Sequence, residues 1–501
     1  MFKEISQVGK HSAIYGVGQI LQRLVSFLLI PMYTAYFTTS DYGIQEILNN
    51  TSSVLTTLLS LGLISGMYRS YFMYADEERR NNVARTAMSV YVVSSALVGG
   101  LLIIFARPLS ILVLPDRSYS PLLVLTLIFI ILNNIVAVPF AVLRAKSQSV
   151  RFVALSLVQF LANIAGTVYL VAFLHRGVQG SLEGNLIGQV AVLLLFIPAI
   201  LELLKGSFSR VDLKEMLTFG LPLVPALLAS ISLSVADRYF LRAYSTFDEI
   251  GVYGLGYKIG LLVQVLVVTP FSLSWGPVMW SVAEKPFAKQ FYSKVMTYFT
   301  TVALYMALIV SMLSPELIRL MSQRQSYWRA WQVVPLITLS YVLYGMYSQL
   351  SIGINLKKKT QYLPFLLWAA AGLNLLLNFL LIPRWGMMGA AVATLVSYFV
   401  LAVLVYFVSQ RLYAFRYEWN RLLKLSLFFL LCYGASFLIP PASIWVTIGI
   451  KLALLLIFPL ALLGSRFFTP EELTRGKELV AVGYSKLNSQ FHPGNIPESR
   501  N

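Results

Sequence analysis

Six charged side chains lie inside strongly apolar segments of this sequence, where an ionised group is costly. A basic or acidic residue at the centre of a membrane-spanning helix costs roughly 2.5–3.5 kcal/mol on insertion scales, so such residues usually mark functional positions. The basic members are Arg23, Arg238, Arg242 and Lys258, and the acidic members are Asp237 and Glu46. These six are the candidate functional residues.

Their chemistry suits an anionic ligand. The planar guanidinium of arginine binds two oxygens of a phosphate or pyrophosphate at once, and lysine adds a point charge. We therefore predict substrate binding by the four basic residues and ion coupling by Asp237 and Glu46. The alternative is structural: Arg238 or Arg242 pairs with Asp237, while Arg242 and Glu46 reach the lipid headgroups.

Other kinds of chemistry find little support in the sequence. The histidines, His11, His175 and His492, are far apart, and we expect no metal site. The sequence contains no G-x-x-x-x-G-K-[ST], no D-x-D and no H-E-x-x-H, so we expect no bound cofactor and no ATP hydrolysis of that kind. Its loops are too short for a catalytic domain. We do not expect an enzyme.

The elements that carry these residues must be membrane helices. Of 501 residues, 57% are hydrophobic and 12% charged, and apolar stretches of span length recur along the chain. The first has no small-residue cleavage site, so we expect it to be retained. The prediction is an all-α polytopic membrane protein with about fourteen spans, near 12–37, 43–70, 84–106, 119–143, 151–174, 182–204, 216–243, 250–275, 293–314, 331–353, 361–382, 388–409, 421–439 and 443–464.

Loop charges predict the orientation. Most of the 39 lysines and arginines fall in alternate loops, which places those loops and both termini in the cytoplasm. Segment 315–330 is the exception, because its three arginines fall on the predicted outside. Basic loops against anionic lipid account for the net charge of +18, so no nucleic-acid partner is expected.

The two halves of the chain resemble each other. "YFTTSDYGIQEIL" from Tyr36 aligns with "YSTFDEIGVYGLG" from Tyr244, "LRAKSQ" from Leu143 with "LKKKTQ" from Leu356, and "GVQGS" from Gly177 with "GMMGA" from Gly386. Each offset is about 210 residues, as expected for a duplicated unit. Spans 1 and 2 thus correspond to spans 7 and 8, and these four spans together carry all six charges.

This repeat divides the chain into four parts. We predict an N-terminal six-helix lobe over 1–210, a C-terminal six-helix lobe over 211–410, two extra spans over 411–464 and a cytoplasmic tail over 465–501. In the tail, Thr469, a following proline and Glu472 predict the capped start of a short helix. Parallel six-helix halves typically enclose a cavity and rock to alternate its access.

Three segments carry a family resemblance. "GQILQRLVSFLLIPMYTAYFTTSDYGIQEI", "SVADRYFLRAY" running into "IGVYGLGYKIG", and "GMMGAAVATLVSY" resemble the polysaccharide transporter branch of the multidrug/oligosaccharidyl-lipid/polysaccharide exporter superfamily, the Wzx-type flippases. The resemblance covers nearly the whole chain. It implies a two-lobed transporter in which Arg23 resembles the family's first-helix cation and Asp237, Arg238 and Lys258 resemble its "DR" and "YK" charges.

The resemblance also implies a substrate and a location. The family moves an undecaprenyl-pyrophosphate-linked oligosaccharide across the bacterial plasma (inner) membrane, driven by an H+ or Na+ gradient or by the membrane potential. Its implied partners are membrane lipids, glycosyltransferases and a glycan polymerase. Two alternatives remain: a drug/cation antiporter of the same superfamily, and a membrane-bound glycan polymerase or glycosyltransferase. An antiporter is expected to have twelve spans and a carboxylate-rich cavity, and a polymerase a long external loop.

Overall fold

The computed structural model describes residues 27, 29–205, 207–439 and 443–474. These residues form helices joined by short turns, with no strand among them. Ten of the described helices are long and apolar enough to cross a membrane, or up to twelve if each of two bent pairs is one span. Large apolar side chains such as Ile104, Leu112 and Leu438 are exposed, as expected where lipid is the solvent. The predicted all-α polytopic membrane fold is confirmed.

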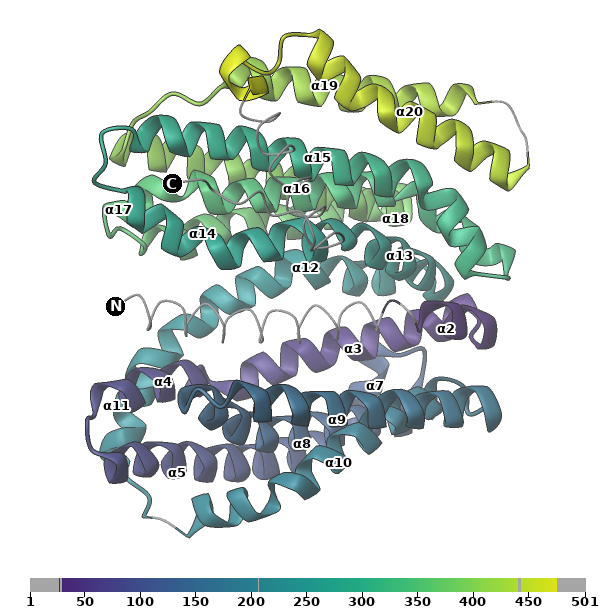
Figure 1. Cartoon of the computed structure of the whole chain (residues 1–501). Coiled ribbons are helices and arrows are strands. Elements are labelled where there is room, and N and C mark those ends of the chain that lie inside the picture. The colour runs from purple at the N-terminus through teal and green to yellow at the C-terminus, as the bar shows by residue number, and fades with distance from the viewer. Residues whose placement is uncertain (1–26, 28, 206, 440–442, 475–501) are drawn as a thin grey trace, which may run out of the picture.

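The described helices form two bundles (Figure 1). The first bundle contains α2 (Ile30–Tyr36), α3 (Thr39–Ser60), α4 (Leu63–Met73), α5 (Glu77–Ser94), α6 (Gly100–Ile104), α7 (Ala106–Val113), α8 (Ser120–Ala145), α9 (Ser149–Val168) and α10 (Gly177–Leu204). Helices α3 and α4 meet at a bend of 42° and together fill the predicted span 43–70. Most of the predicted first span, including Arg23, lies outside the described residues.

The connecting helix α11 (Arg210–Gly220) leads into the second bundle, which contains α12 (Val224–Tyr244), α13 (Phe247–Gly260), α14 (Thr269–Val282), α15 (Ala288–Met321), α16 (Val334–Leu350), α17 (Ile352–Leu356) and α18 (Tyr362–Leu412). Gly386, at φ 52° and ψ −131°, divides α18 between the two spans predicted there. Helix α11 packs on α4 and α5 of the first bundle, whereas α12 packs on α18 of the second. One continuous candidate span, Arg210–Tyr244, therefore contacts both bundles.

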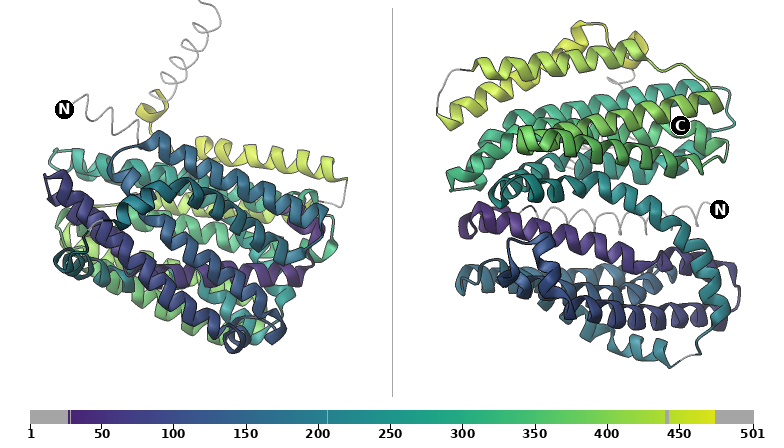
Figure 2. Two further views of the ribbon diagram at one scale, coloured as in Figure 1. Left: turned by 90° about the horizontal axis from the view of Figure 1, so that it is seen from below. Right: turned by 180° about the vertical axis from the view of Figure 1, so that it is seen from behind.

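Two further helices, α19 (Trp419–Ala435) and α20 (Ile444–Gly464), pack on α15. They lie on the side of the second bundle that faces away from the first (Figures 1 and 2). After them, the Thr469 hydroxyl accepts a hydrogen bond from the Glu472 N–H, and the Glu472 carboxylate accepts one from the Thr469 N–H. The capping box predicted for the tail is present.

Local structure recurs between the two halves where the sequence predicted it. Thr38 caps the start of α3 and Thr246 caps the start of α13, each accepting a hydrogen bond from the N–H three residues on. Gly177 and Gly386 both have positive φ, a conformation that glycine adopts without a steric penalty. Two of the three paired polar segments thus have the same backbone roles.

Candidate functional site

Helices α3 and α13 cross at the junction of the two bundles, and two glycines allow their backbones to approach. A Cβ atom on Gly43 would overlap the carbonyl oxygen of Phe247, and one on Gly251 would overlap that of Thr39. Beside this crossing, the Thr39 hydroxyl donates a hydrogen bond to the Asp248 carboxylate. The crossing brings the charged residues of both helices together.

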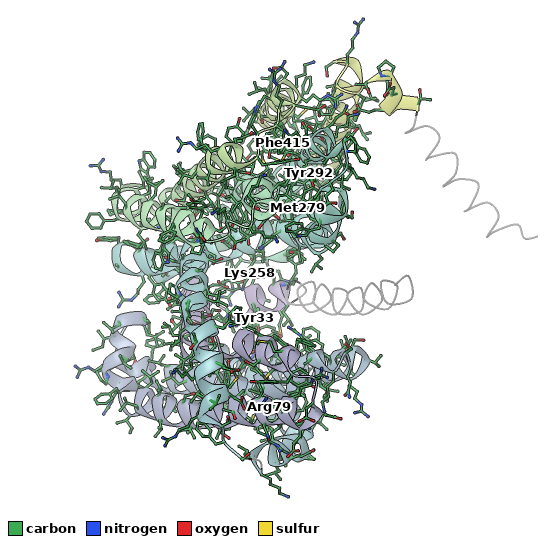
Figure 3. All side chains as sticks on the ribbon, turned by 90° about the vertical axis from the view of Figure 1, so that its left-hand side faces the viewer. Tyr33, Arg79, Lys258, Met279, Tyr292 and Phe415 are labelled. Atoms are coloured by element: carbon green, nitrogen blue, oxygen red, sulfur yellow. The ribbon has the colours of Figure 1, made fainter. Side chains whose placement is uncertain are left out.

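Glu46 of α3 and Lys258 of α13 form an ion pair across this junction. The Lys258 ammonium also donates a hydrogen bond of 3.1 Å to the Tyr42 hydroxyl and lies 4.7 Å from the centre of that ring. The Glu46 side chain is 7% exposed, whereas that of Lys258 is 33% exposed. Lys258 lies between the bundles, near Tyr33 (Figure 3). The carboxylate is thus enclosed while its cation remains accessible.

Asp237 and Arg238 of α12 form a second pair inside the second bundle. The guanidinium is 2.7 Å from Asp237 Oδ1 and also donates to the Ser234 carbonyl oxygen at 2.7 Å. The Tyr253 hydroxyl donates to the other Asp237 oxygen. The guanidinium lies 3.8 Å from the centre of the Tyr257 ring, a cation–π contact. Both charged residues are buried, so this pair fastens α12 to α13.

The remaining candidates lie elsewhere. Arg242 donates hydrogen bonds of 3.0 Å to the carbonyl oxygens of Ile111 and Leu114, at the end of α7. Its positive charge complements the negative end of that helix, and the contact links α12 to the first bundle. Arg23 lies outside the described residues. The structure therefore brings Glu46 together with Lys258 and Asp237 with Arg238, while Arg242 is engaged separately.

Further contacts join the bundles near the starts of α3 and α13. Tyr327, between α15 and α16, donates a hydrogen bond of 2.8 Å to the Thr38 carbonyl oxygen, and its ring meets the Tyr42 ring edge-on at 5.8 Å. The Thr34 hydroxyl donates to the Met321 carbonyl oxygen at 2.8 Å. These contacts join the two bundles at one end of the junction, the closed end. The loop charges predict that this end faces outward.

A third intramembrane pair, Glu316 of α15 and Lys451 of α20, is absent from the sequence prediction. The ammonium lies 2.8 Å from each carboxylate oxygen and 2.7 Å from the Met312 carbonyl oxygen. Both side chains are buried. Lys451 interrupts an apolar run, which was a usable signal, but Glu316 follows residue 314, where the ninth span was predicted to end. Helix α15 continues through Pro315 to Met321.

An ionic network fastens Glu472, which follows α20, to α15 and α19. Arg421 of α19 donates two hydrogen bonds to the Glu472 carboxylate, at 3.2 and 3.1 Å, and Lys294 of α15 lies 3.7 Å from it. Burial alone would raise the pKa of Glu472. Hydrogen bonds from Arg421, the Thr469 N–H and Tyr298 outweigh burial and lower the pKa to about 2.

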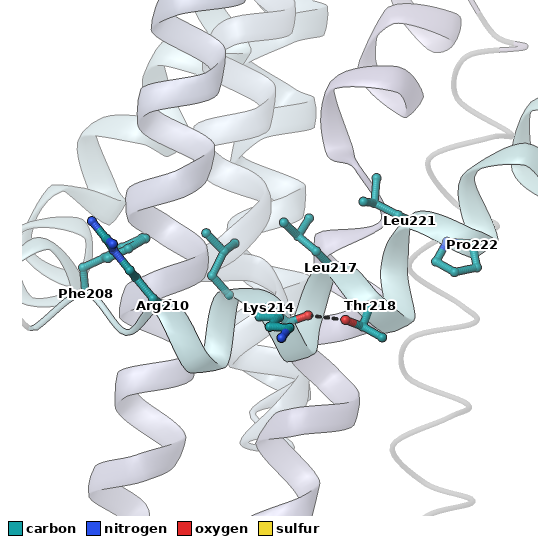
Figure 4. A pocket seen from close by; sticks show the side chains of 8 residues that line it. Phe208, Arg210, Lys214, Leu217, Thr218, Leu221 and Pro222 are labelled. Carbon is teal, nitrogen blue, oxygen red and sulfur yellow. Dashed lines mark hydrogen bonds between the residues drawn. The ribbon is translucent and has the colours of Figure 1, made fainter.

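Two of the cavities lie away from the Glu46–Lys258 pair, the central pair of the site. One of about 640 Å³ follows α11, where Arg210 and Lys214 stand among apolar side chains of the same segment (Figure 4). Another of about 540 Å³ is lined by Asp248, Glu249 and Arg329 at the start of α13. Among the described residues, no group of three or more His, Cys, Asp or Glu side chains is arranged to hold a metal ion.

Comparison with solved structures finds the same architecture in two other proteins. The structure titled "Lipid II flippase MurJ, inward closed conformation" superposes with a TM-score of 0.74 at 16% identity, covering 89% of this chain and 98% of that one. An inward-facing multidrug resistance MATE family transporter of the MOP superfamily gives 0.60 at 16% identity, covering 78% and 97%. At these identities the likeness concerns the fold.

Sequence comparison identifies the family of this chain. The Lsg locus putative protein 1 of Haemophilus influenzae is 22% identical over 276 residues, 52% of this chain and 63% of that protein. The uncharacterized membrane protein MJ1068 of Methanocaldococcus jannaschii is 20% identical over 427 residues, 78% of this chain and 83% of that protein. The family model described as "Polysaccharide biosynthesis protein" matches residues 8–282, more than half of the chain. The chain is a multi-pass membrane protein that belongs to this polysaccharide biosynthesis protein family.

Proposed function

We propose that this chain moves an undecaprenyl-pyrophosphate-linked oligosaccharide across the bacterial plasma membrane by alternating access. The observation that carries the proposal is the Glu46–Lys258 pair, a partly accessible cation bound to the opposite bundle by one enclosed carboxylate. A pyrophosphate carries more negative charge than that carboxylate and offers several acceptor oxygens. It therefore competes for Lys258 when the lipid-linked headgroup enters between the bundles.

Competition at Lys258 links substrate binding to motion. When the phosphate takes over the ammonium, Glu46 loses its partner at a site where water is scarce, and an unpaired buried carboxylate is strongly disfavoured. Uptake of H+, or of Na+, by Glu46 relieves this penalty. The contact between α3 and α13 loses its ionic component at the same step, which favours separation of the bundles at the closed end.

The other predicted residues take supporting roles in this proposal. Asp237 and Arg238 bind each other and the two tyrosines, so they position α12 and α13. Arg242 holds α12 on the end of α7, and we retain Arg23 as a second phosphate ligand. Cytoplasmic termini, an energy source other than ATP, and glycosyltransferase and polymerase partners complete the proposal.

The test compares variants in the native host after deletion of the chromosomal copy. We expect Lys258→Ala to lower surface glycan at least tenfold while membrane insertion, measured by immunoblot, stays normal. Lys357→Ala, which removes an exposed lysine between α17 and α18, serves as the matched control. Wild-type glycan export by Lys258→Ala contradicts the proposal.

The drug/cation antiporter is the second candidate, and the enclosed Glu46 carboxylate together with the likeness to the MATE transporter favours it. A cation antiporter needs Glu46 as the ligand of its substrate, whereas Lys258 would only occupy the empty site. Drug susceptibility of the deletion strain separates the two. A strain that is hypersensitive to cationic drugs but has normal surface glycan supports the antiporter.

A further inference from the structure

A basic pocket lies between the first turns of α15 and the connection from α18 to α19, far from the Glu46–Lys258 pair along the chain. Its volume is about 420 Å³, and its polar lining includes Lys289, Ser293, Lys294, Arg416 and Glu418. Three of these five side chains are cationic and one is anionic. The balance of charge in the pocket depends on which of them are already paired.

Glu418 and Lys294 of this pocket already interact with other groups. Glu418 accepts a hydrogen bond of 2.7 Å from the Thr297 hydroxyl and pairs with Arg421 at 3.2 Å. Lys294 is 3.7 Å from Glu472. Within the described ranges, Lys289 and Arg416 make no ion pair with a carboxylate. Two exposed cations therefore remain available to a ligand.

The Ser293 hydroxyl gives a second, independent sign of a ligand. Ser293 is 5% exposed and lines the pocket, and its side-chain oxygen has no hydrogen-bond partner in the described structure. A buried hydroxyl without a partner is unfavourable. An acceptor oxygen bound between Lys289 and Arg416 would supply the missing partner and neutralise the two cations.

The pocket is held in shape by its surroundings. Phe415 packs on the Tyr292 ring at 6.1 Å, and the Tyr292 hydroxyl donates to the Met279 carbonyl oxygen at 2.8 Å; these three residues lie together in the second bundle (Figure 3). The Gln410 side chain bonds both the N–H and the carbonyl oxygen of Phe415, at 3.0 and 2.7 Å. The connection is fixed before any ligand arrives, which lowers the entropic cost of binding.

Aromatic residues beside the pocket indicate its depth in the membrane. Trp419 is 43% exposed and contacts the rings of Tyr406 and Tyr417. Tryptophan and tyrosine concentrate where the lipid headgroups meet the hydrocarbon. The pocket also lies at the ends of the candidate spans α15 and α19, on the side that the loop charges predict to be cytoplasmic. A headgroup phosphate is therefore its natural anion.

We propose that this pocket binds the phosphate headgroup of an anionic phospholipid, such as phosphatidylglycerol, from the cytoplasmic leaflet. Basic pockets between membrane helices on that side are suited to such headgroups. Lys289 and Arg416 supply the charge, the Ser293 hydroxyl donates a hydrogen bond, and the acyl chains extend along the exposed faces of α15 and α19. The lipid thereby stabilises the attachment of α19 to the second bundle.

The test is a titration of the full chain in detergent with phosphatidylglycerol, phosphatidylcholine or inorganic phosphate, read as the change in Tm. We expect phosphatidylglycerol alone to raise Tm. The double variant Lys289→Ala/Arg416→Ala should bind it about thirtyfold more weakly, the effect of two charges at an anionic surface. The control Lys357→Ala/Lys359→Ala removes two exposed lysines elsewhere and should bind like wild type.

Ser293→Ala provides a variant that keeps every charge, and we expect it to weaken phosphatidylglycerol binding several-fold without lowering the Tm of the lipid-free chain. Two results overturn the proposal. One is an equal response of the double variant and wild type to phosphatidylglycerol. The other is an equal effect of inorganic phosphate and phosphatidylglycerol, which would make this a site for soluble anions. Neither result bears on Lys258.

Discussion

Gly43 of α3 and Gly251 of α13 each face the backbone of the other helix, at equivalent positions of the two halves. The absence of a side chain at both positions is what allows the two backbones to approach this closely. Any side chain here must push the two helices apart. The crossing places Glu46 and Lys258 on opposite sides of the same junction.

The first prediction concerns a substitution of Gly251 at this crossing. Gly251→Ala inserts a methyl group against the Thr39 carbonyl oxygen, and overpacking of this kind costs about 1–3 kcal/mol. We expect a lower Tm in detergent and loss of most surface glycan export. Gly276→Ala is the control, because a Cβ atom there meets nothing within 4 Å. A Gly251→Ala protein with wild-type Tm and export would show that the close approach is dispensable.

Exchanging the charges of the central pair separates its structural role from substrate binding. We expect Glu46→Lys with Lys258→Glu to recover much of the stability that either single change loses, because the pair is rebuilt in reverse. Export should stay below about a tenth of wild type, because the carboxylate at 258 repels the phosphate. Tm and surface glycan are measured on the same four proteins. Full export by the exchanged protein would reduce Lys258 to a structural residue.

The Asp237–Arg238 pair should behave differently. Asp237→Asn leaves a buried guanidinium without its counter-ion, and breaking a buried pair costs about 3–5 kcal/mol. We expect a large fall in Tm, with most of it recovered when Arg238→Gln is added. If the pair only positions α12 and α13, this double variant exports glycan at near wild-type levels. A stable double variant that does not export glycan would support the ion-coupling role that the sequence predicted for Asp237.

The Glu316–Lys451 pair attaches α20 to α15, and its loss should loosen that helix. Lys451→Ala leaves the buried Glu316 carboxylate without its counter-ion, so we expect the free energy of unfolding to fall by about 3–5 kcal/mol. Lys451→Met with Glu316→Leu removes both charges and should restore most of the stability. Tm in detergent gives the first comparison, and cysteine cross-linking between α15 and α20 gives the second. A single variant as stable as wild type contradicts a structural role for the pair.

The tail network predicts a specific pH dependence. The pKa of Glu472 falls from its ordinary 4.5 to about 2 in the folded chain, so its stabilising effect is complete above pH 4.5 and is lost as pH falls toward about 2. The Tm difference between wild type and Glu472→Gln should thus be constant between about pH 5 and 8. Glu471→Gln, the exposed neighbouring carboxylate, is the control. A difference that changes across this range contradicts the network.

The sequence predicted the helices well because membrane spans need long apolar runs, and it matched the caps and turns of the two halves because these depend on local residue types. Thr38, Thr246, Gly177 and Gly386 are examples. Ion-pair partners were harder to predict. Lys258 meets Glu46 only because α3 and α13 cross at their glycines, and Lys451 meets Glu316 across two helices that share no repeat relationship. Such pairings depend on the packing of distant segments.

The helix from Arg210 to Tyr244 begins against α4 and α5 and ends against α18. The two bundles therefore cannot rotate independently, because one packs on the start of this helix and the other packs on its end. The bending must be concentrated where regular α-helix gives way to the 3-10 turn Leu221–Leu223, flanked by Pro225. The stiffness of these few residues therefore limits how far the two bundles can separate.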